Sequence, residues 1–75
     1  MTAINLTLTL SDGALVRVLG VTERRGFPLV SVAAQPRPSA EKLDVQLGVQ
    51  SDRPIQLLIR QLEKLHDVRS VEVMT

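Results

Sequence analysis

The sequence contains no cysteine, tryptophan or tyrosine, and its only histidine is His66. Without cysteine there is neither a disulfide framework nor a thiolate metal site, which excludes copper-chaperone chemistry, and one histidine cannot build a zinc centre. Phe27 is the only aromatic residue, so the stacking platforms of RNA-recognition domains are absent. The fold must therefore depend on an aliphatic core of Leu, Val and Ile.

Charge of one sign and long apolar runs are also scarce. Nine Lys and Arg against eight Asp and Glu give a net charge of +1, too small to attract nucleic acid or anionic lipid from a distance. No apolar run approaches the length of a membrane span, and the N-terminus lacks a secretory pattern, so we expect a cytoplasmic protein. Residues 1–75 should form one small domain that buries only about 60% of its unfolded surface and benefits from a partner.

Four segments have the composition of strands. Residues 4–10 alternate Ile and Leu with Asn and Thr, and residues 43–49 alternate Leu and Val with Asp, Gln and Gly, which predicts two half-buried strands. Residues 27–35 are apolar at odd and even positions alike, as in a strand with both faces covered or one beside another subunit. Residues 68–73 contain three valines and finish the chain as a short strand. Residues 35–41 hold two prolines and predict a hairpin loop, before which the second strand should end.

Between these strands lie two segments with the apolar spacing of amphipathic helices. The first follows Ser11–Asp12, a pair that can cap the free amides of a helix, and ends at Gly26, which suits a left-handed C-cap. The second follows Ser51–Asp52, another candidate N-cap, and has Pro54 in its first turn. The order βαββαβ predicts an α+β, ferredoxin-like fold, a four-stranded antiparallel sheet with two helices on one face.

In this topology the second and fourth strands are the edges of the sheet. The second strand is apolar, and an exposed apolar edge favours pairing with another chain. We therefore expect a homo-oligomer, most simply a dimer, whose interface contains Leu29, Val30, Ser31, Val32, Ala33 and Ala34. The face opposite to the helices should carry polar side chains, those of Asn5, Thr7, Thr9, Asp44, Gln46 and Gln50.

Four short motifs occur in a fixed order. Gly13-Ala14-Leu15, Arg17-Val18-Leu19 and Arg25-Gly26-Phe27 surround the first predicted helix, and QL-x-KL-x-DV spans residues 61–68. Together they resemble the ACT domain over nearly the whole chain, and more narrowly the small regulatory subunits of acetolactate (acetohydroxyacid) synthase. The resemblance implies a non-catalytic subunit that docks on the large catalytic subunit and raises its activity in branched-chain amino-acid synthesis. Thiamine diphosphate, magnesium and FAD would belong to that partner.

The resemblance also implies an effector site between paired subunits. It would combine Ser11, Asp12, Gly13, Ala14 and Leu15 of one chain with Pro28, Leu29 and Val30 of its neighbour. The free amides and partial positive charge of a helix N-terminus suit the carboxylate of an amino acid. Valine-responsive relatives commonly carry Asn where this chain has Leu10 and Pro28, so the chain resembles the short, valine-insensitive type and we expect it to respond little to valine.

Plainer interpretations compete with these. A free-standing amino-acid-sensing ACT module, without an enzyme partner, is the rival class. Arg24 and Arg25 fit a solvated helix end better than a partner-binding surface, and His66 fits a helix C-terminus. Asp12 fits an N-cap better than a ligand contact, whereas Gly13 suits a turn and a close ligand approach equally. Acylphosphatase-like catalysis is disfavoured, because the loop after the first strand is acidic and lacks the arginine that such catalysis needs.

Overall fold

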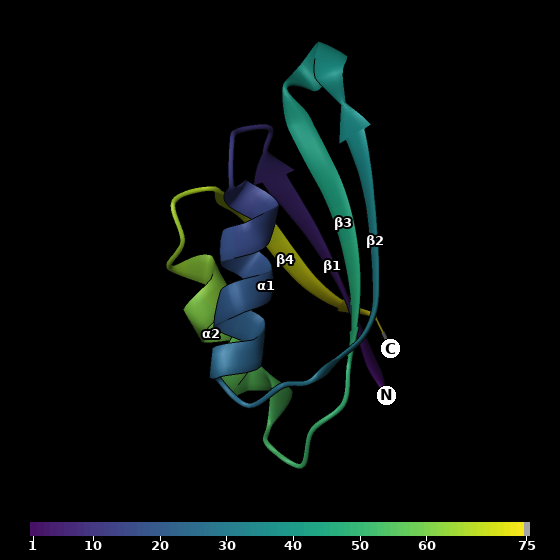
Figure 1. Ribbon diagram of the computed structural model, residues 1–75, viewed down its shortest axis with the longest axis vertical. Coiled ribbons are helices and arrows are strands. Elements are labelled where there is room, and N and C mark those ends of the chain that lie inside the picture. Colours follow the sequence, from purple (N-terminus) through teal and green to yellow (C-terminus); the bar gives the residue numbers. More distant parts are fainter. Residues whose placement is uncertain (75) are drawn as a thin grey trace.

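The computed structural model describes residues 1–74 and arranges them as a sheet with two helices on one side (Figure 1). The strands are β1 (Thr2–Thr9), β2 (Leu29–Arg37), β3 (Lys42–Val49) and β4 (Val68–Met74), and the helices are α1 (Ala14–Arg24), α2 (Ile55–Glu63) and the 3-10 helix η1 (Pro38–Ala40). All neighbouring strands are antiparallel, in the order β2-β3-β1-β4. The ferredoxin-like prediction and the edge positions of β2 and β4 are thus confirmed.

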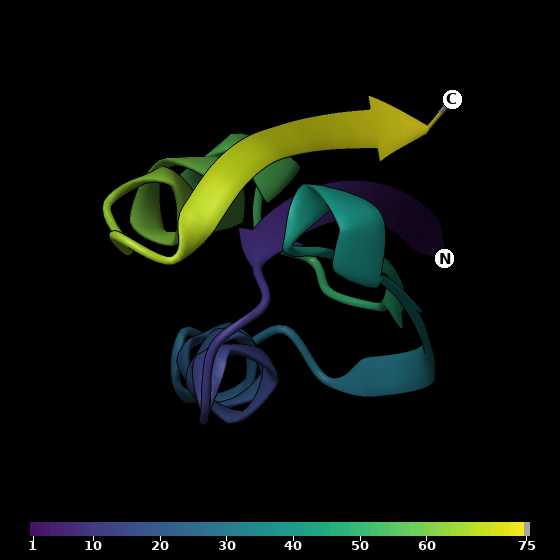
Figure 2. The same ribbon diagram turned by 90° about the horizontal axis from the view of Figure 1, so that it is seen from above.

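The core lies between the central strands and the helices, which Figure 2 shows on the same side of the twisted sheet. Ile4 and Leu6 of β1 stand opposite Leu47 and Val45 of β3, so their alternation directs one apolar row of each strand toward the helices. The buried apolar residues are Ile4, Leu6, Leu8, Ala14, Val18, Phe27, Val45, Leu47, Val49, Leu58 and Leu62. Within residues 1–74, no helix is long and apolar enough to cross a membrane.

The start of α1 differs from the prediction. Gly13 is the N-cap, with φ at +77°, and no side chain caps the first turn, so the expectation that Ser11 or Asp12 caps the helix was wrong. The Ser11 hydroxyl instead donates to Asp67, 56 residues further along the chain. The predicted C-terminus is confirmed, because Gly26 has φ at +86° and follows the C-cap residue in the left-handed conformation.

The start of α2 also differs. Pro54 is the N-cap rather than a first-turn residue, with no side-chain cap, so neither Ser51 nor Asp52 caps this helix. The Ser51 hydroxyl accepts a 3.0 Å bond from the amide of Arg53 and donates a 3.1 Å bond to the carbonyl of Gly26. The Ser51 hydroxyl thus connects the β3–α2 loop to the end of α1.

The second strand is longer than predicted. It continues through Pro36 to Arg37, so the expectation that it ends before residue 35 was wrong. As an edge strand β2 pairs only with β3, and such an edge tolerates a proline whose missing amide faces away from the ladder. Arg37 Nη2 also donates a 2.8 Å bond to Asp44 Oδ1 of β3, which joins the end of β2 to its neighbour. The true loop contains only η1 and Glu41.

Candidate functional site

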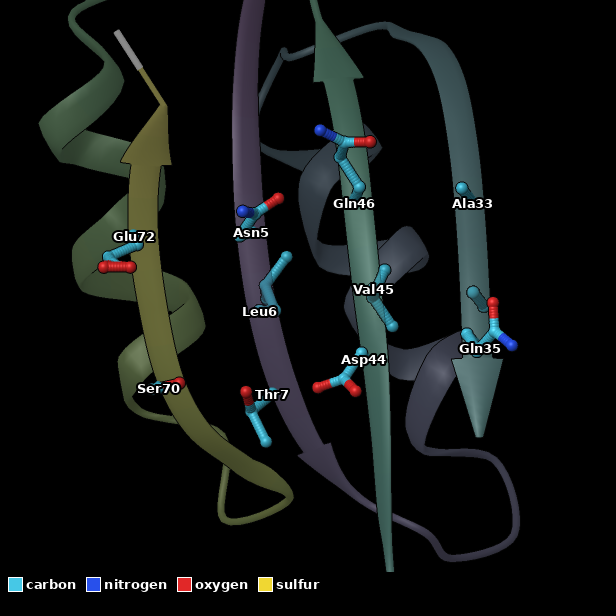
Figure 3. A pocket seen from close by; sticks show the side chains of 11 residues that line it. Asn5, Leu6, Thr7, Ala33, Gln35, Asp44, Val45, Gln46, Ser70 and Glu72 are labelled. Carbon is cyan, nitrogen blue, oxygen red and sulfur yellow. The ribbon is translucent and has the colours of Figure 1, made fainter. Parts of the chain in front are cut away.

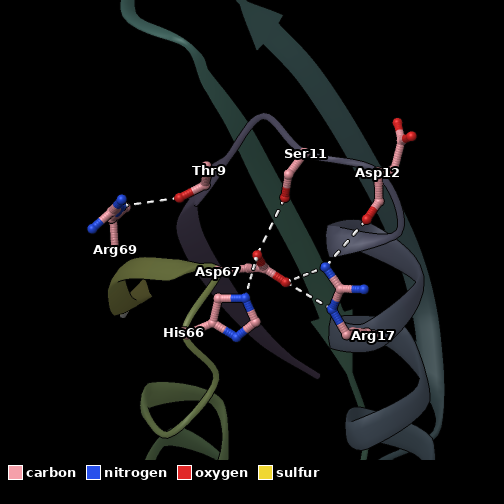
Figure 4. Close-up of polar contacts among 7 residues, drawn as sticks. All are labelled: Thr9, Ser11, Asp12, Arg17, His66, Asp67 and Arg69. Atoms are coloured by element: carbon pink, nitrogen blue, oxygen red, sulfur yellow. Dashed lines mark hydrogen bonds and ion pairs between the residues drawn. The ribbon is translucent and has the colours of Figure 1, made fainter.

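One carboxylate, that of Asp67, joins the β1–α1 loop to the turn between α2 and β4 (Figure 4). Arg17 Nε donates a 2.7 Å hydrogen bond to Asp67 Oδ2, and Arg17 Nη2 donates to the same oxygen. The Ser11 hydroxyl donates to Asp67 Oδ1 at 3.2 Å, and His66 Nε2 lies 3.4 Å from that oxygen. The Asp67 side chain is only 6% exposed, so its charge is compensated mainly by Arg17.

The backbone completes this junction. The carbonyl of Asp67 accepts a 2.8 Å bond from the amide of Thr9, and Arg17 Nη2 donates a 3.2 Å bond to the carbonyl of Asp12. A Cβ atom at Gly13 would lie 2.9 Å from Arg17 Nη1, in a backbone conformation that already disfavours other residues. The left-handed backbone conformation therefore favours glycine at position 13, and the closeness of Arg17 adds to this preference, whereas the role of Gly13 in ligand binding stays a prediction.

The same contacts govern the ionisation of Asp67. Hydrogen bonds from Arg17 lower the pKa of its carboxyl group, burial opposes this by raising the pKa, and the Ser11 hydroxyl adds to the lowering. Asp67 is therefore ionised at neutral pH, where it holds the guanidinium of Arg17 over the start of α1.

Asp67 was not singled out from the sequence, although it lies in the QL-x-KL-x-DV motif. Arg17 lies in another motif, 50 residues earlier, and no sequence pattern pairs the two. The sequence contained one indication of this pair, namely that two separate motifs contain residues of opposite charge.

The two halves of the candidate effector site lie at opposite ends of α1 in one chain (Figure 1). Residues 11–15 form its N-terminal end and residues 28–30 follow its C-terminal end. The 11 residues of α1 span about 16 Å, so a single chain does not bring the halves together. The Ala14 amide donates to the Ser11 carbonyl and the Arg17 amide to the Gly13 carbonyl, so the amides of residues 15 and 16 are the candidates for a carboxylate.

The candidate interface strand is open to solvent. Val30 and Val32 are 53% and 44% exposed, residues 31–34 are exposed throughout, and Leu29 is half-buried. Pro28 is also exposed, and its carbonyl accepts a 3.1 Å bond from the amide of Gln50. Contact of these residues with a second chain stays a prediction.

The sheet face away from the helices is polar, as expected (Figure 3). Asn5, Thr7, Asp44 and Gln46 line a groove of about 500 Å³ there, together with Ser70, Glu72 and part of β2. Asp44 is engaged by Arg37 at one end of this groove. Across the described part of the chain, no three His, Cys, Asp or Glu side chains converge on a possible metal site.

Comparison with known proteins identifies the protein family of the chain. The pattern that defines the ACT domain matches residues 10–71. The ACT domain of GTP pyrophosphokinase from Chlorobium tepidum superposes with a TM-score of 0.82 over 97% of this chain and 95% of that chain, at 15% identity. The chain therefore belongs to the ACT domain family.

The sequence relatives define the branch of this family. The chain is 34% identical over 70 residues to the isozyme 2 small subunit of acetolactate synthase from Escherichia coli, which covers 93% of this chain and 80% of that protein. It is 29% identical over 69 residues to the isozyme 1 small subunit, covering 92% and 72%. The acetolactate synthase small subunit of Thermotoga maritima superposes with a TM-score of 0.86 over 99% of this chain and 47% of that chain, at 20% identity. The chain is a homologue of these small subunits.

The Arg17–Asp67 pair leads to a test by pH. Because the pKa of folded Asp67 lies below the ordinary aspartate value of about 3.9, its contribution to stability is complete above about pH 4 and is lost as the pH falls toward the folded pKa. We expect Asp67→Asn to lower the free energy of unfolding at neutral pH and to make its decline below about pH 4 shallower. Urea denaturation followed by circular dichroism at several pH values measures both effects.

Asp52→Asn provides the control, because Asp52 is exposed and forms no ion pair within residues 1–74. It should keep the stability and the pH dependence of the wild type. An Asp67→Asn variant with an unchanged acid limb would contradict the assigned role of the carboxylate.

Proposed function

We propose that this chain is a non-catalytic regulatory subunit that binds the catalytic subunit of acetolactate synthase and raises its activity in branched-chain amino-acid synthesis. The observation that carries the proposal is the 34% identity to an acetolactate synthase small subunit over 93% of the chain. In this proposal the complex is cytoplasmic, and thiamine diphosphate, magnesium and FAD are bound by the catalytic partner.

A subunit without reacting groups can activate an enzyme by preferring one of its conformations. It must bind the active conformation of the catalytic subunit more tightly than the inactive one, because equal affinity shifts no equilibrium. A preference of about 1.4 kcal/mol changes the ratio of the two conformations tenfold.

We further propose that the chain acts as a homodimer formed through β2. Val30 and Val32 expose apolar side chains on this edge, which has hydrogen-bonding groups on the side away from β3. Pairing with a second copy would cover both. It would also offer residues 28–30 of the partner as neighbours for the effector loop.

Reconstitution tests the main proposal. Adding the purified chain to its cognate large subunit should raise the rate of acetolactate formation to a plateau, while the chain alone forms no acetolactate. An active large subunit whose rate does not change at saturating chain would contradict the proposal. It would favour the alternative, a free-standing amino-acid-sensing module.

The proposed dimer is tested by substitution on the edge strand. Val32→Lys places a charge at the centre of the interface, so it should shift the mass from dimer toward monomer, as measured by light scattering at about 100 μM, where micromolar association is visible. Glu41→Gln changes the net charge equally but lies in the hairpin loop, and it should leave the mass unchanged. A wild-type chain that is strictly monomeric would contradict the dimer.

We also predict little valine feedback through this subunit. The Leu10 side chain is apolar and 44% exposed, so it cannot accept from an ammonium group, and Pro28 has no amide to donate. Each hydrogen bond to a charged group contributes about 1.5–3 kcal/mol, so two missing bonds weaken binding by roughly two to four orders of magnitude. Calorimetry should show no saturable valine binding below about 1 mM.

A variant sharpens this measurement. Leu10→Asn restores one carbonyl acceptor and should tighten valine binding relative to the wild type. A micromolar dissociation constant for the unmodified chain would contradict the prediction and mean that other groups of the loop bind the ligand.

A further inference from the structure

A positively charged groove runs between the C-terminal end of α1 and the outer side of α2. Two adjoining hollows, of about 610 and 420 Å³, share Arg25, Gln61 and Lys64 and thus form one continuous feature. We call it the basic groove, and its cationic side chains are those of Arg24, Arg25, Arg53, Arg60 and Lys64. Leu57, Gln61 and Lys64 have helical i, i+4, i+7 spacing, so one stripe of α2 lines its wall.

The fold brings three separate segments to this groove. Gly26 ends α1 in the left-handed conformation, and Arg53 crosses it so closely that a Cβ atom at Gly26 would lie 2.8 Å from Arg53 Nε. The bond from the Ser51 hydroxyl to the Gly26 carbonyl fixes this approach. Arg24 folds back along α1 over Gly20, since a Cβ atom there would lie 3.0 Å from its guanidinium.

Within residues 1–74, none of these cations forms an ion pair. The ion pairs formed within residues 1–74 involve Arg17 and Arg37, and His66 lies 3.4 Å from Asp67. None of these three residues lines the groove. Glu63 is the one carboxylate among its lining residues. Outside the lining of the basic groove, the remaining four Lys and Arg are outnumbered by seven Asp and Glu, of which Glu23 and Asp52 adjoin Arg24 and Arg53 in the sequence. The net charge of +1 therefore combines a basic groove lining with an acidic remainder.

The helix ends do not account for this excess. Arg24 and Arg25 lie at the C-terminal end of α1, and Lys64 lies at that of α2. Each helix C-terminus carries a partial charge of about −0.5, so the two together balance about one cation. With Glu63 they balance about two of the five cations, which leaves the lining of the groove with a net positive charge.

We propose that the basic groove is the docking surface for an acidic segment of the acetolactate synthase catalytic subunit. This inference rests on the proposed function and adds the surface and the chemistry of its partner. Four of the five cations are arginines, whose planar guanidinium groups bind carboxylates in a bidentate manner. Leu57, 45% exposed on the same wall, adds an apolar contact at the rim of the charged cluster.

Arginine also binds phosphate, yet nucleic acid fits this surface less well. Single strands are bound largely by stacking of bases on aromatic rings, and the chain's one ring, Phe27, is 1% exposed in the core. The polarised charge distribution, acidic outside the groove, would also repel a long polyanion that extended past it.

Charge reversal with a matched control tests the inference. Arg60→Glu combined with Lys64→Glu reverses two charges of the basic groove, and Lys42→Glu combined with Arg69→Glu makes the same net change on the strands. The dissociation constant for the purified large subunit is measured by calorimetry at about 50 and 500 mM salt. We expect the groove variant to bind about tenfold or more weakly at low salt and within about threefold of wild type at high salt, with the control close to wild type at both.

Chemical crosslinking gives an independent readout. The chain has two lysines, Lys42 and Lys64, and a carbodiimide joins a lysine directly to a carboxylate that contacts it. Mass spectrometry of the crosslinked wild-type complex should show Lys64, and not Lys42, joined to Asp or Glu of the large subunit. If the charge-reversed variant fails to fold by circular dichroism, Arg60→Gln with Lys64→Gln replaces it and should show the same salt-dependent loss in weaker form.

The possible failures are distinguishable. A wild-type chain that does not bind the large subunit overturns the proposed function and this inference together. A wild-type chain that binds and activates, with a groove variant of equal affinity and no crosslink from Lys64, overturns the docking surface alone. Unchanged affinity for the large subunit combined with lost binding of a mixed-sequence single-stranded RNA would assign the groove to nucleic acid instead, and would also overturn it.

Discussion

One-sided burial of the two central strands is the constraint on which the rest of this structure depends. Ile4, Leu6 and Leu8 of β1 and Val45, Leu47 and Val49 of β3 have at most a few per cent of their surface exposed. With no cysteine and one aromatic ring, the chain has little else to build a core from. Covering a single face requires both helices on the same side. The opposite sheet face and the edge β2 are consequently left open, and these are surfaces that a regulatory subunit can offer to partners.

The Arg17–Asp67 pair adds an electrostatic connection to a fold that otherwise depends on aliphatic packing. It connects the start of α1 and the end of β1 to the turn before β4, segments that lie far apart in the sequence. The two residues belong to different motifs of the family resemblance. That they bond to each other gives a physical reason for the motifs to occur together in one chain.

The charged side chains, like the apolar ones, are distributed unevenly over the fold. Cations gather where α1 ends and along α2, while the acidic residues lie mostly elsewhere, and the small net charge hides this separation. A chain whose charges are satisfied by neighbours, as Asp44 is by Arg37, needs no outside partner for them. The basic groove is different, because its five cations exceed the negative charge that the two helix ends and Glu63 provide.

Local patterns in the sequence determined the elements, because strand alternation, helical spacing and glycine at a left-handed C-cap each depend on neighbouring residues alone. They determined the element order, the fold class and the family. They failed at Ser11, which bonds to Asp67 rather than capping α1, and at Pro36, which an edge strand accommodates. The Arg17–Asp67 pair and the basic groove join residues from segments far apart in the sequence. Only the tertiary structure could decide these features, because packing of the helices against one face sets which distant charges become neighbours.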